Sequence, residues 1–353
     1  MDLNELLTKA VEQGASDLHV SVGVGPLVRI DGSLVALEGY EVLSPDAARE
    51  LVTAELNEDQ KADLEEKGEA DLSMGVHGVG RFRVNVFRQR GTYAMVARVI
   101  PYNILSFEQL KLPAALTQFC NKTKGLVLVT GPTGSGKSTT LACVIDYINK
   151  NRRCHIVTLE DPIEYLHKHS KSVINQREIG ADTKSFASGL RSALREDPDV
   201  ILVGEMRDQE TIATAIQAAE TGHLVLATLH TNDCTQTVDR IIDVFPPHQQ
   251  QQIRVQLSLA LEGVASQQLL PRKDKRGRIV AVEVLVVNSA IRNLIREGKT
   301  HQIYSVIQTG GRLGMQTMDT ALRNLVVEGL VTVDEALMRA GNTEEFKRLV
   351  RMK

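Results

Sequence analysis

The chain contains no tryptophan and few other aromatic residues, only seven phenylalanines and six tyrosines. Proteins that hold single-stranded nucleic acid usually stack bases on aromatic side chains, so this scarcity argues against such a surface. The 41 basic and 44 acidic residues nearly cancel, and the strongly positive charge typical of DNA- and RNA-binding domains is therefore lacking as well. We expect no nucleic acid among the partners.

Cysteines and long apolar runs are also scarce. Cys120, Cys143, Cys154 and Cys234 lie far apart without a C-x-x-C pair, which indicates neither a zinc site nor a disulfide framework and favours a reducing cytoplasmic compartment. No apolar run reaches the roughly 18 residues of a membrane-spanning helix, and residues 1–13 have the pattern of an amphipathic helix, not of a signal peptide. We expect no direct membrane insertion and only peripheral association through other proteins.

A chain of 353 residues exceeds the size at which single cores usually stop growing, so we expect two domains. Residues 1–100 alternate short helix and strand patterns, typical of an α+β module. The loop-like segment 102–113 predicts a linker, with residues 1–115 in the first domain and linker and 116–353 in the second. The expected helices are 3–12, 45–54 and 58–67, and the expected strands are 17–21, 27–30, 70–76, 81–88 and 93–100.

After Gly125 the pattern changes to continuous apolar strands separated by helices. Strands without alternation are buried on both faces, which indicates a parallel sheet and an α/β fold. Ligands of such sheets bind beyond the carboxyl ends of the strands. Polar residues follow each of the four expected strands, so these strands deliver them to one edge of the sheet. The strands are 126–130, 155–161, 199–205 and 223–230.

The sequence GPTGSGKST follows the first of these strands and opens a helical pattern over 141–148. It fits the phosphate-binding motif G-x-x-x-x-G-K-[ST], whose backbone N–H groups surround phosphates at a helix N-terminus. Lys137 is expected to reach the β- and γ-phosphates of ATP, and Ser138 to bind Mg²⁺. The predicted nucleotide-binding residues are Gly131, Thr133, Gly134, Ser135, Gly136, Lys137, Ser138 and Thr139.

Carboxylates follow the second and third strands. Glu205 ends DVILVGE, where a Mg²⁺-binding carboxylate is expected, whereas Asp199 lies at the opposite end of that strand. In LEDPIEY, Glu164 is the candidate that orients the attacking water, and Glu160 and Asp161 are candidates for supporting roles. A solvated strand end and a charged surface turn are the alternative interpretations of these two segments.

Histidines and arginines complete the candidate set. His230 ends the fourth strand and is expected near the γ-phosphate, while His223 begins that strand and its role is left open. In GRFRVNVF the period of two places Arg81 and Arg83 on the face opposite Phe82. The arginines could reach the phosphates of a neighbouring subunit, or they could simply be solvated.

The segment SAIRNLIREGK reads as a packing helix. Its apolar stripe consists of Ala290, Ile291, Leu294 and Ile295, Gly298 ends it, and Arg292, Asn293, Arg296 and Glu297 are expected on the outer face. This outer face is either solvated surface or a surface for a partner. Periodicity alone does not distinguish the two.

These motifs, together with GASDLHV at 14–20, HLVLATLHT at 223–231 and AIRNLIREGK at 290–299, resemble the secretion ATPase superfamily, in particular its type IV pilus retraction ATPases. The resemblance covers essentially the full length. It implies a PAS-like N-terminal α+β domain and a RecA-like C-terminal ATPase domain with a helical extension. It also implies a homohexameric ring that hydrolyses ATP with Mg²⁺ to power pilus retraction and twitching motility, and a partner in the pilus platform protein of the inner membrane.

Residue roles also follow from the resemblance. Lys137 and Ser138 match the phosphate-loop pair, Glu164 the catalytic glutamate, Glu205 the Walker B glutamate and His230 the histidine motif. Arg81 and Arg83 match arginines that the N-terminal domain supplies to the nucleotide.

Three alternatives remain: a type II secretion or pilus assembly ATPase, a DNA-translocating RecA-like motor, and a nucleotide switch with negligible turnover. Extension ATPases usually add an N-terminal domain and a tetracysteine motif. Neither is found here, which favours retraction.

Overall fold

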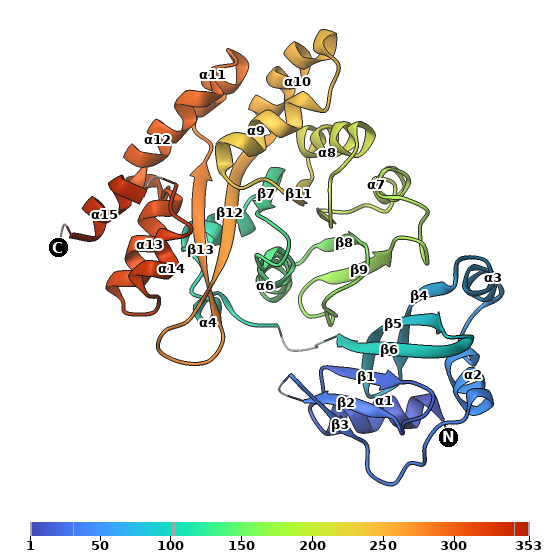
Figure 1. The fold of residues 1–353 in the computed structure, drawn as a ribbon. Helices are drawn as coiled ribbons and strands as arrows, with labels where there is room; N and C mark the ends of the chain where they lie inside the picture. Colours follow the sequence, from blue (N-terminus) through green and yellow to red (C-terminus); the bar gives the residue numbers. More distant parts are fainter. Residues whose placement is uncertain (1, 31, 101–103, 342, 352–353) are drawn as a thin grey trace. The chain divides into compact units, whose positions relative to one another are not determined.

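The structure is a computed structural model that describes residues 2–30, 32–100, 104–341 and 343–351. By their internal contacts the residues form two compact units (Figure 1): Met1–Asn103 with Glu164–Leu166, and Ile104–Ile163 with His167–Lys353. Phe107 and Leu112 pack into a core of the second unit. The segment from Ile104 is accordingly grouped with the second unit. The first part of the predicted linker, 101–103, lies outside the described residues.

The first unit combines three helices with a six-stranded antiparallel sheet in the order β3-β2-β1-β6-β5-β4. This agrees with the predicted α+β module, except that β3 was not expected. All four residues of β3 are exposed, so it lacks the alternation that reveals a half-buried strand. The elements are α1 (Leu3–Glu12), β1 (Asp17–Val20), β2 (Leu27–Ile30), β3 (Ser33–Ala36), α2 (Pro45–Thr53), α3 (Glu58–Lys67), β4 (Glu69–Val76), β5 (Gly80–Gln89) and β6 (Thr92–Ile100).

Helix periodicity and strand alternation build the core of this unit. Leu3, Leu6, Leu7 and Ala10 are buried on one face of α1, at the spacing of an amphipathic helix. Side chains of α2, α3 and the apolar face of β5 join the same cluster. Asn57 caps α3 with a capping box, which satisfies N–H groups that the first helical turn leaves unpaired.

The second unit contains a seven-stranded sheet in the order β13-β12-β7-β11-β10-β8-β9. Its strands are β7 (Gly125–Thr130), β8 (His155–Glu160), β9 (Val173–Glu178), β10 (Val200–Val203), β11 (Leu224–Leu229), β12 (Leu261–Pro271) and β13 (Arg278–Val286). All neighbours are parallel except β12 and β13, which form an antiparallel pair. The four predicted parallel strands are confirmed. Strands β9, β12 and β13 were not predicted from the sequence. Polar residues fill most of β9, and glycine, serine and glutamine interrupt β12, whereas β13 is mostly apolar and carried a usable signal.

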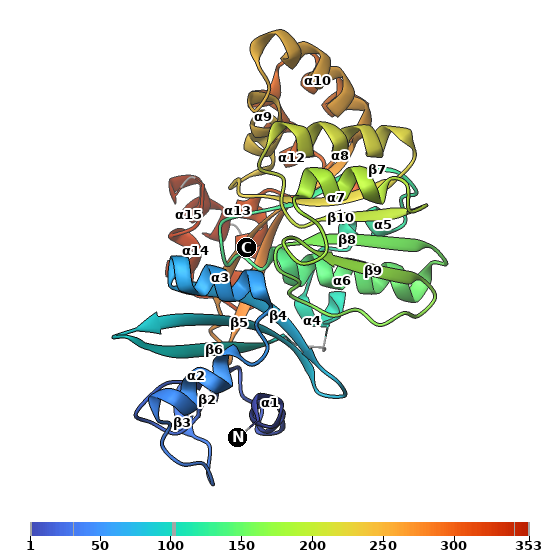
Figure 2. The ribbon, with the colours of Figure 1, turned by 90° about the vertical axis from the view of Figure 1, so that its right-hand side faces the viewer.

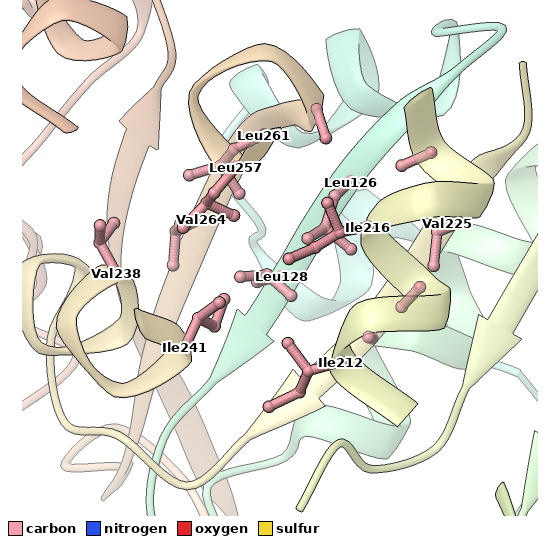
Figure 3. Packing of buried hydrophobic residues seen from close by; sticks show 14 of the residues in the cluster. Leu126, Leu128, Ile212, Ile216, Val225, Val238, Ile241, Leu257, Leu261 and Val264 are labelled. Atoms are coloured by element: carbon pink, nitrogen blue, oxygen red, sulfur yellow. The ribbon is translucent and has the colours of Figure 1, made fainter. Parts of the chain in front are cut away.

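Helices cover both faces of this sheet (Figures 1 and 2). Leu126 and Leu128 of β7 pack with α7 to α10, and Figure 3 shows them beside Ile212 and Ile216 of α8. The alternate residues of β7 pack with α5 and α6 on the other face. Burial on both faces explains the unbroken apolar runs. The helices are α4 (Phe107–Leu110), α5 (Ala115–Cys120), α6 (Lys137–Asn151), α7 (Phe186–Ala193), α8 (Gln209–Thr221), α9 (Cys234–Asp243) and α10 (Pro247–Ala260).

Helices follow the β12–β13 hairpin to the end of the described chain. Leu322 of α13 and Phe346 of α15 share an apolar cluster with Leu270 and Ile279 of the hairpin. None of the described helices combines the length and the apolar character needed to cross a bilayer. The helices are α11 (Ser289–Arg296), α12 (Ile303–Thr309), α13 (Met318–Val327), α14 (Val333–Leu337) and α15 (Thr343–Arg351), with 3₁₀ turns at Thr300–Gln302 and Gly311–Leu313.

Helix α11 follows the expected pattern with two corrections. Ile291 and Ile295 are fully buried, and Gly298, with φ of 69°, follows its last turn as expected. Ala290, however, is exposed. Arg292 is half-buried instead of facing outward, because its guanidinium donates to the carbonyl oxygens of Ser258 (2.6 Å) and Leu259 (2.8 Å) at the end of α10.

Candidate active site

The phosphate-loop motif forms the turn between β7 and α6. Gly131 and Gly136 have φ of 141° and 90°, a region that favours glycine. A Cβ atom on Gly131 would lie 2.4 Å from the carbonyl oxygen of Gln267, so the loop passes too close to β12 for a side chain at this position. Lys137 begins the 15-residue helix α6. Strand, turn and helix thus follow one another as a phosphate loop requires.

The loop has free hydrogen-bonding capacity suited to an anion. Helix α6 has no side-chain cap, and the positive end of its dipole lies at this loop, which favours an anion there. Ser135 is buried, and its hydroxyl oxygen has no hydrogen-bond partner among the described residues. Thr133 and Gly134 are exposed, and Ser138 and Thr139 are partly exposed in the first turn of α6. The residues present fit a polyphosphate.

Three of the predicted site residues contact one another. Lys137 Nζ donates to the carbonyl oxygens of Gly131 (2.9 Å) and Pro132 (3.2 Å) and lies 3.5 Å from His230 Nδ1. His230 Nε2 lies 3.0 Å from Glu205 Oε1. A neutral imidazole with its proton on Nε2 satisfies both contacts, since it donates to Glu205 and accepts from Lys137. The ends of β7, β10 and β11 therefore meet at one edge of the sheet, as expected.

Glu205 follows β10 and is largely buried, with 18% of its side chain exposed. The same Oε1 atom lies 2.6 Å from Arg207 Nε, and this contact raises the pKa of the Arg207 guanidinium. Arg207 is not among the candidate residues predicted from the sequence. Its position two residues after Glu205, in the same loop, was the available signal.

Two hydrogen bonds hold the loop that contains Glu205 against β11. The Thr228 hydroxyl donates to Gly204 O (2.5 Å), and Met206 N–H donates to Thr228 O (3.1 Å).

Two other polar residues considered in the sequence, Asp199 and His223, lie at the amino ends of β10 and β11, far from the phosphate loop. Asp199 accepts from His155 N–H (2.8 Å), and His223 Nδ1 lies 3.0 Å from Ala218 O. Both contacts support the fold away from the phosphate loop, which answers the open question about His223.

The carboxylates at the end of β8 and in the loop that follows it differ in their exposure to solvent. Glu160 Oε1 accepts from the Thr158 hydroxyl (2.6 Å) and from Gln176 Nε2 (3.1 Å), which fixes it between β8 and β9. Asp161 and Glu164 are both exposed. The carboxylate of Glu164 is therefore open to solvent, whereas that of Glu160 is held by hydrogen bonds within the sheet.

Arg81 and Arg83 lie on β5 of the first unit. Phe82, Val84 and Val86 are buried in its core, so the predicted division of this strand into an apolar and a polar face is confirmed. Arg81 Nε donates to the Ser73 hydroxyl (2.8 Å) on the neighbouring strand. Arg83 is exposed. Of the two guanidinium groups, that of Arg83 is the more accessible to a ligand.

Few protein groups are arranged to hold a metal ion. Among the residues that the structure describes, no three His, Cys, Asp or Glu side chains form a group able to bind one. Mg²⁺ is typically bound by one or two protein oxygens together with substrate phosphates, so a small donor set is what such a site needs. Ser138 in the first turn of α6 and Glu205 at the end of β10 fit this donor set.

Comparisons with known proteins agree with this geometry. Residues 1–338 match the family described as type II/IV secretion system proteins. The type IV pilus retraction ATPase PilT of Pseudomonas aeruginosa is 49% identical over 346 residues, which cover 98% of this chain and 100% of that protein. A twitching motility protein of Neisseria gonorrhoeae is 48% identical over 344 residues, which cover 98% of this chain and 91% of that protein.

The fold is similar as well. A crystal structure of the pilus retraction motor PilT with bound ADP matches this structure with a TM-score of 0.91 and 50% identity, covering 99% of each chain. The similarity to PilT thus extends over nearly the whole length of the chain in both sequence and structure. The chain belongs to the family of type II/IV secretion system proteins and is an ATPase of that family.

Proposed function

We propose that this protein is a homohexameric motor that hydrolyses ATP to power type IV pilus retraction and thereby twitching motility. The main support is the contact chain Lys137–His230–Glu205 at a phosphate loop, in a protein similar to named retraction ATPases over nearly its full length. An assembly or type II secretion ATPase would share the nucleotide chemistry. The near-complete match to PilT favours retraction.

The proposed chemistry assigns one task to each residue. The loop N–H groups and Lys137 bind the phosphates of ATP, and Ser138 and Glu205 hold Mg²⁺, which supplies charge neutralisation when bound. The accessible Glu164 orients the attacking water. His230 contacts both Lys137 and Glu205, so a shift of either group changes the position of the other.

The proposed architecture follows the same reasoning. The first unit would be the PAS-like domain, and the second unit, with six parallel strands in the order β12-β7-β11-β10-β8-β9, the RecA-like domain. In a hexameric ring, Arg81 and Arg83 would reach a nucleotide held by a neighbouring subunit. We further propose a cytoplasmic protein whose partner is a pilus platform protein at the inner membrane, with peripheral association through that partner.

The test is ATP turnover by the purified protein and its Glu164→Gln variant. If Glu164 orients water, the variant retains ADP affinity and loses about 10²–10⁴-fold in kcat, the range typical of a lost general base. The control is Lys171→Gln, which removes an exposed charge from the same loop and leaves kcat unchanged. Native turnover by Glu164→Gln would remove this residue from the mechanism.

A further inference from the structure

Strand β12 runs beside β7 and ends its pairing with that strand where the phosphate loop begins. Its residue Ser266 pairs with Thr130, the last residue of β7. Gln267 follows Ser266 and therefore lies level with the first residue of the loop, Gly131. The carbonyl oxygen of Gln267 lies 2.4 Å from the position that a Cβ atom on Gly131 would occupy. The backbone of β12 thus borders the start of the loop so closely that only a glycine fits there.

The side chain of Gln267 reaches the other end of the loop. It is 1% exposed, and its Nε2 donates to Thr140 Oγ1 (2.8 Å), a hydrogen bond between two buried groups. Thr140 lies at the first turn of α6, three residues after Lys137. A single residue of β12 therefore meets the loop at its beginning through the backbone and just after its end through the side chain.

The opposite face of β12 is anchored as well. Successive side chains of a strand point to opposite faces of the sheet, so Ser266 points away from α6. Its hydroxyl donates to Asn232 O (2.9 Å), two residues after His230. This part of β12 is thus held by hydrogen bonds on both of its faces, which makes it a fixed support for Gln267.

An amide at this buried position carries a cost that an apolar side chain would avoid. The Oε1 atom of Gln267 is buried and has no hydrogen-bond partner among the residues that the structure describes. A buried carbonyl oxygen that lacks a donor lowers stability, and a methionine would fill much the same space without that cost. The presence of the amide therefore indicates a requirement for its bond to Thr140 that stability alone does not explain.

We propose that Gln267 is a positioning residue of the phosphate loop, which acts through Thr140 and not by contact with the nucleotide. The inference rests on the proposed binding of phosphates at this loop. The amide holds the first turn of α6 at a set distance from β12, so Lys137 and the N–H groups of the turn are arranged for phosphates before a ligand arrives. Without this bond, part of the binding free energy is used to restore the arrangement, and the affinity falls.

Calorimetry on the intact protein with ADP and Mg²⁺ measures this effect. Gln267→Met retains the length of the side chain but removes the hydrogen bond, and we expect it to weaken ADP binding about three- to tenfold, the range of one net hydrogen bond. Tripolyphosphate, which lacks a nucleoside, should lose affinity by the same factor, because the effect concerns the phosphates.

Variants of Thr140 test the same bond from its other side. Thr140→Val removes the hydroxyl and should weaken ADP binding as much as Gln267→Met, whereas Thr140→Ser keeps the hydroxyl and should bind like the wild type. The double variant Gln267→Met with Thr140→Val should lose no more affinity than either single variant, because both changes remove one interaction. Additive losses would mean that the two residues act separately, and the proposal would then be wrong.

Gln316→Met is the matched control for a general weakening of the hairpin. Gln316 Nε2 donates to Val282 O (2.7 Å) on β13, which β12 separates from β7. The control variant therefore loses a glutamine hydrogen bond to the same hairpin and should keep the wild-type ADP affinity. A loss equal to that of Gln267→Met would show that any damage to the hairpin reduces binding, which contradicts a specific role of Gln267.

Lys137→Ala separates a failure of this proposal from a failure of the phosphate assignment. If Lys137→Ala loses affinity while Gln267→Met and Thr140→Val bind ADP like the wild type, the loop binds phosphates but Gln267 does not position it. If Lys137→Ala itself binds ADP and tripolyphosphate like the wild type, the phosphate assignment fails, and the positioning role fails with it.

Discussion

At the scale of single residues, His230 links two charged groups of the site. Its Nδ1 faces Lys137 and its Nε2 faces Glu205, so a neutral imidazole serves as acceptor and donor at once. A doubly protonated ring would instead present a positive charge to the Lys137 ammonium. The neutral tautomer with the proton on Nε2 is thus the form that fits the observed contacts.

His167 is the residue whose burial makes stability depend on pH. Burial lowers the pKa of its imidazole from 6.5 to about 4, and its Nδ1 has no hydrogen-bond partner among the described residues. Because the unfolded state binds the proton at a higher pH than the folded state, the contribution of His167 to the free energy of unfolding is fully present above pH 6.5 and is lost progressively toward pH 4.

We expect the wild-type free energy of unfolding to fall more than that of His167→Gln between about pH 7.5 and pH 5, by about 2 kcal/mol from this group. Urea denaturation at both pH values measures the difference. The comparison cancels the titration of all other groups. Identical pH dependence in the two proteins would show that His167 titrates normally in the folded state.

The sequence located some site residues and not others for a physical reason. Lys137, Glu205 and His230 each closely follow an apolar strand, and the carboxyl ends of parallel strands meet at one edge. Arg278 and Arg339 line a pocket beside the phosphate loop, but they belong to a hairpin and to the end of a helix, so their proximity to the loop depends on long-range packing. No local pattern reveals such a contact.

At the scale of elements, Glu283 joins two helices to the hairpin. Its buried carboxylate on β13 accepts from Cys234 N–H (2.8 Å) at the start of α9 and from Met318 N–H (3.2 Å) at the start of α13. Burial raises the pKa of this carboxyl group. Acceptance of two helical N–H groups compensates part of the cost of burial.

Glu283→Gln should lower the free energy of unfolding by about 1–3 kcal/mol. The amide oxygen can accept from one helix, but the amide NH₂ then faces the N–H donor of the other. Denaturant unfolding measures the change. Glu328→Gln serves as the control, since it removes only an exposed ion pair with Lys111 and should cost under about 1 kcal/mol. Equal losses in both variants would contradict the bridging role.

Helices and strands were predicted correctly where burial gives the apolar residues of the sequence a clear pattern. The helix Leu3–Glu12 and the strands β7, β10 and β11 carry unbroken patterns, and the structure contains them nearly as expected. Arg292 was expected on the outer face of α11 because its polarity suggested exposure, yet it binds the last carbonyl groups of α10. A helical pattern identifies polar positions but does not say which of them meet another helix end.

At the scale of the whole molecule, subunit exchange tests whether the sites are shared between copies. If Arg83 acts on a neighbour's nucleotide, mixing Arg83→Ala with Lys137→Ala should restore part of the ATP turnover, because hybrid rings contain some interfaces with both intact groups. Turnover is measured across mixing ratios, with each variant alone as the control. No recovery at any ratio would assign Arg83 a role within its own subunit.

The central claim is that the turn between β7 and α6 binds the phosphates of ATP through Lys137. The most direct measurement is ADP affinity by calorimetry in the presence of Mg²⁺, for the wild type, Lys137→Ala and the control Lys150→Ala, which removes an exposed lysine from the far end of α6. We predict that Lys137→Ala weakens binding about ten- to hundredfold, the value of a charge-assisted hydrogen bond, while Lys150→Ala matches the wild type. Equal affinity in all three proteins would contradict the claim.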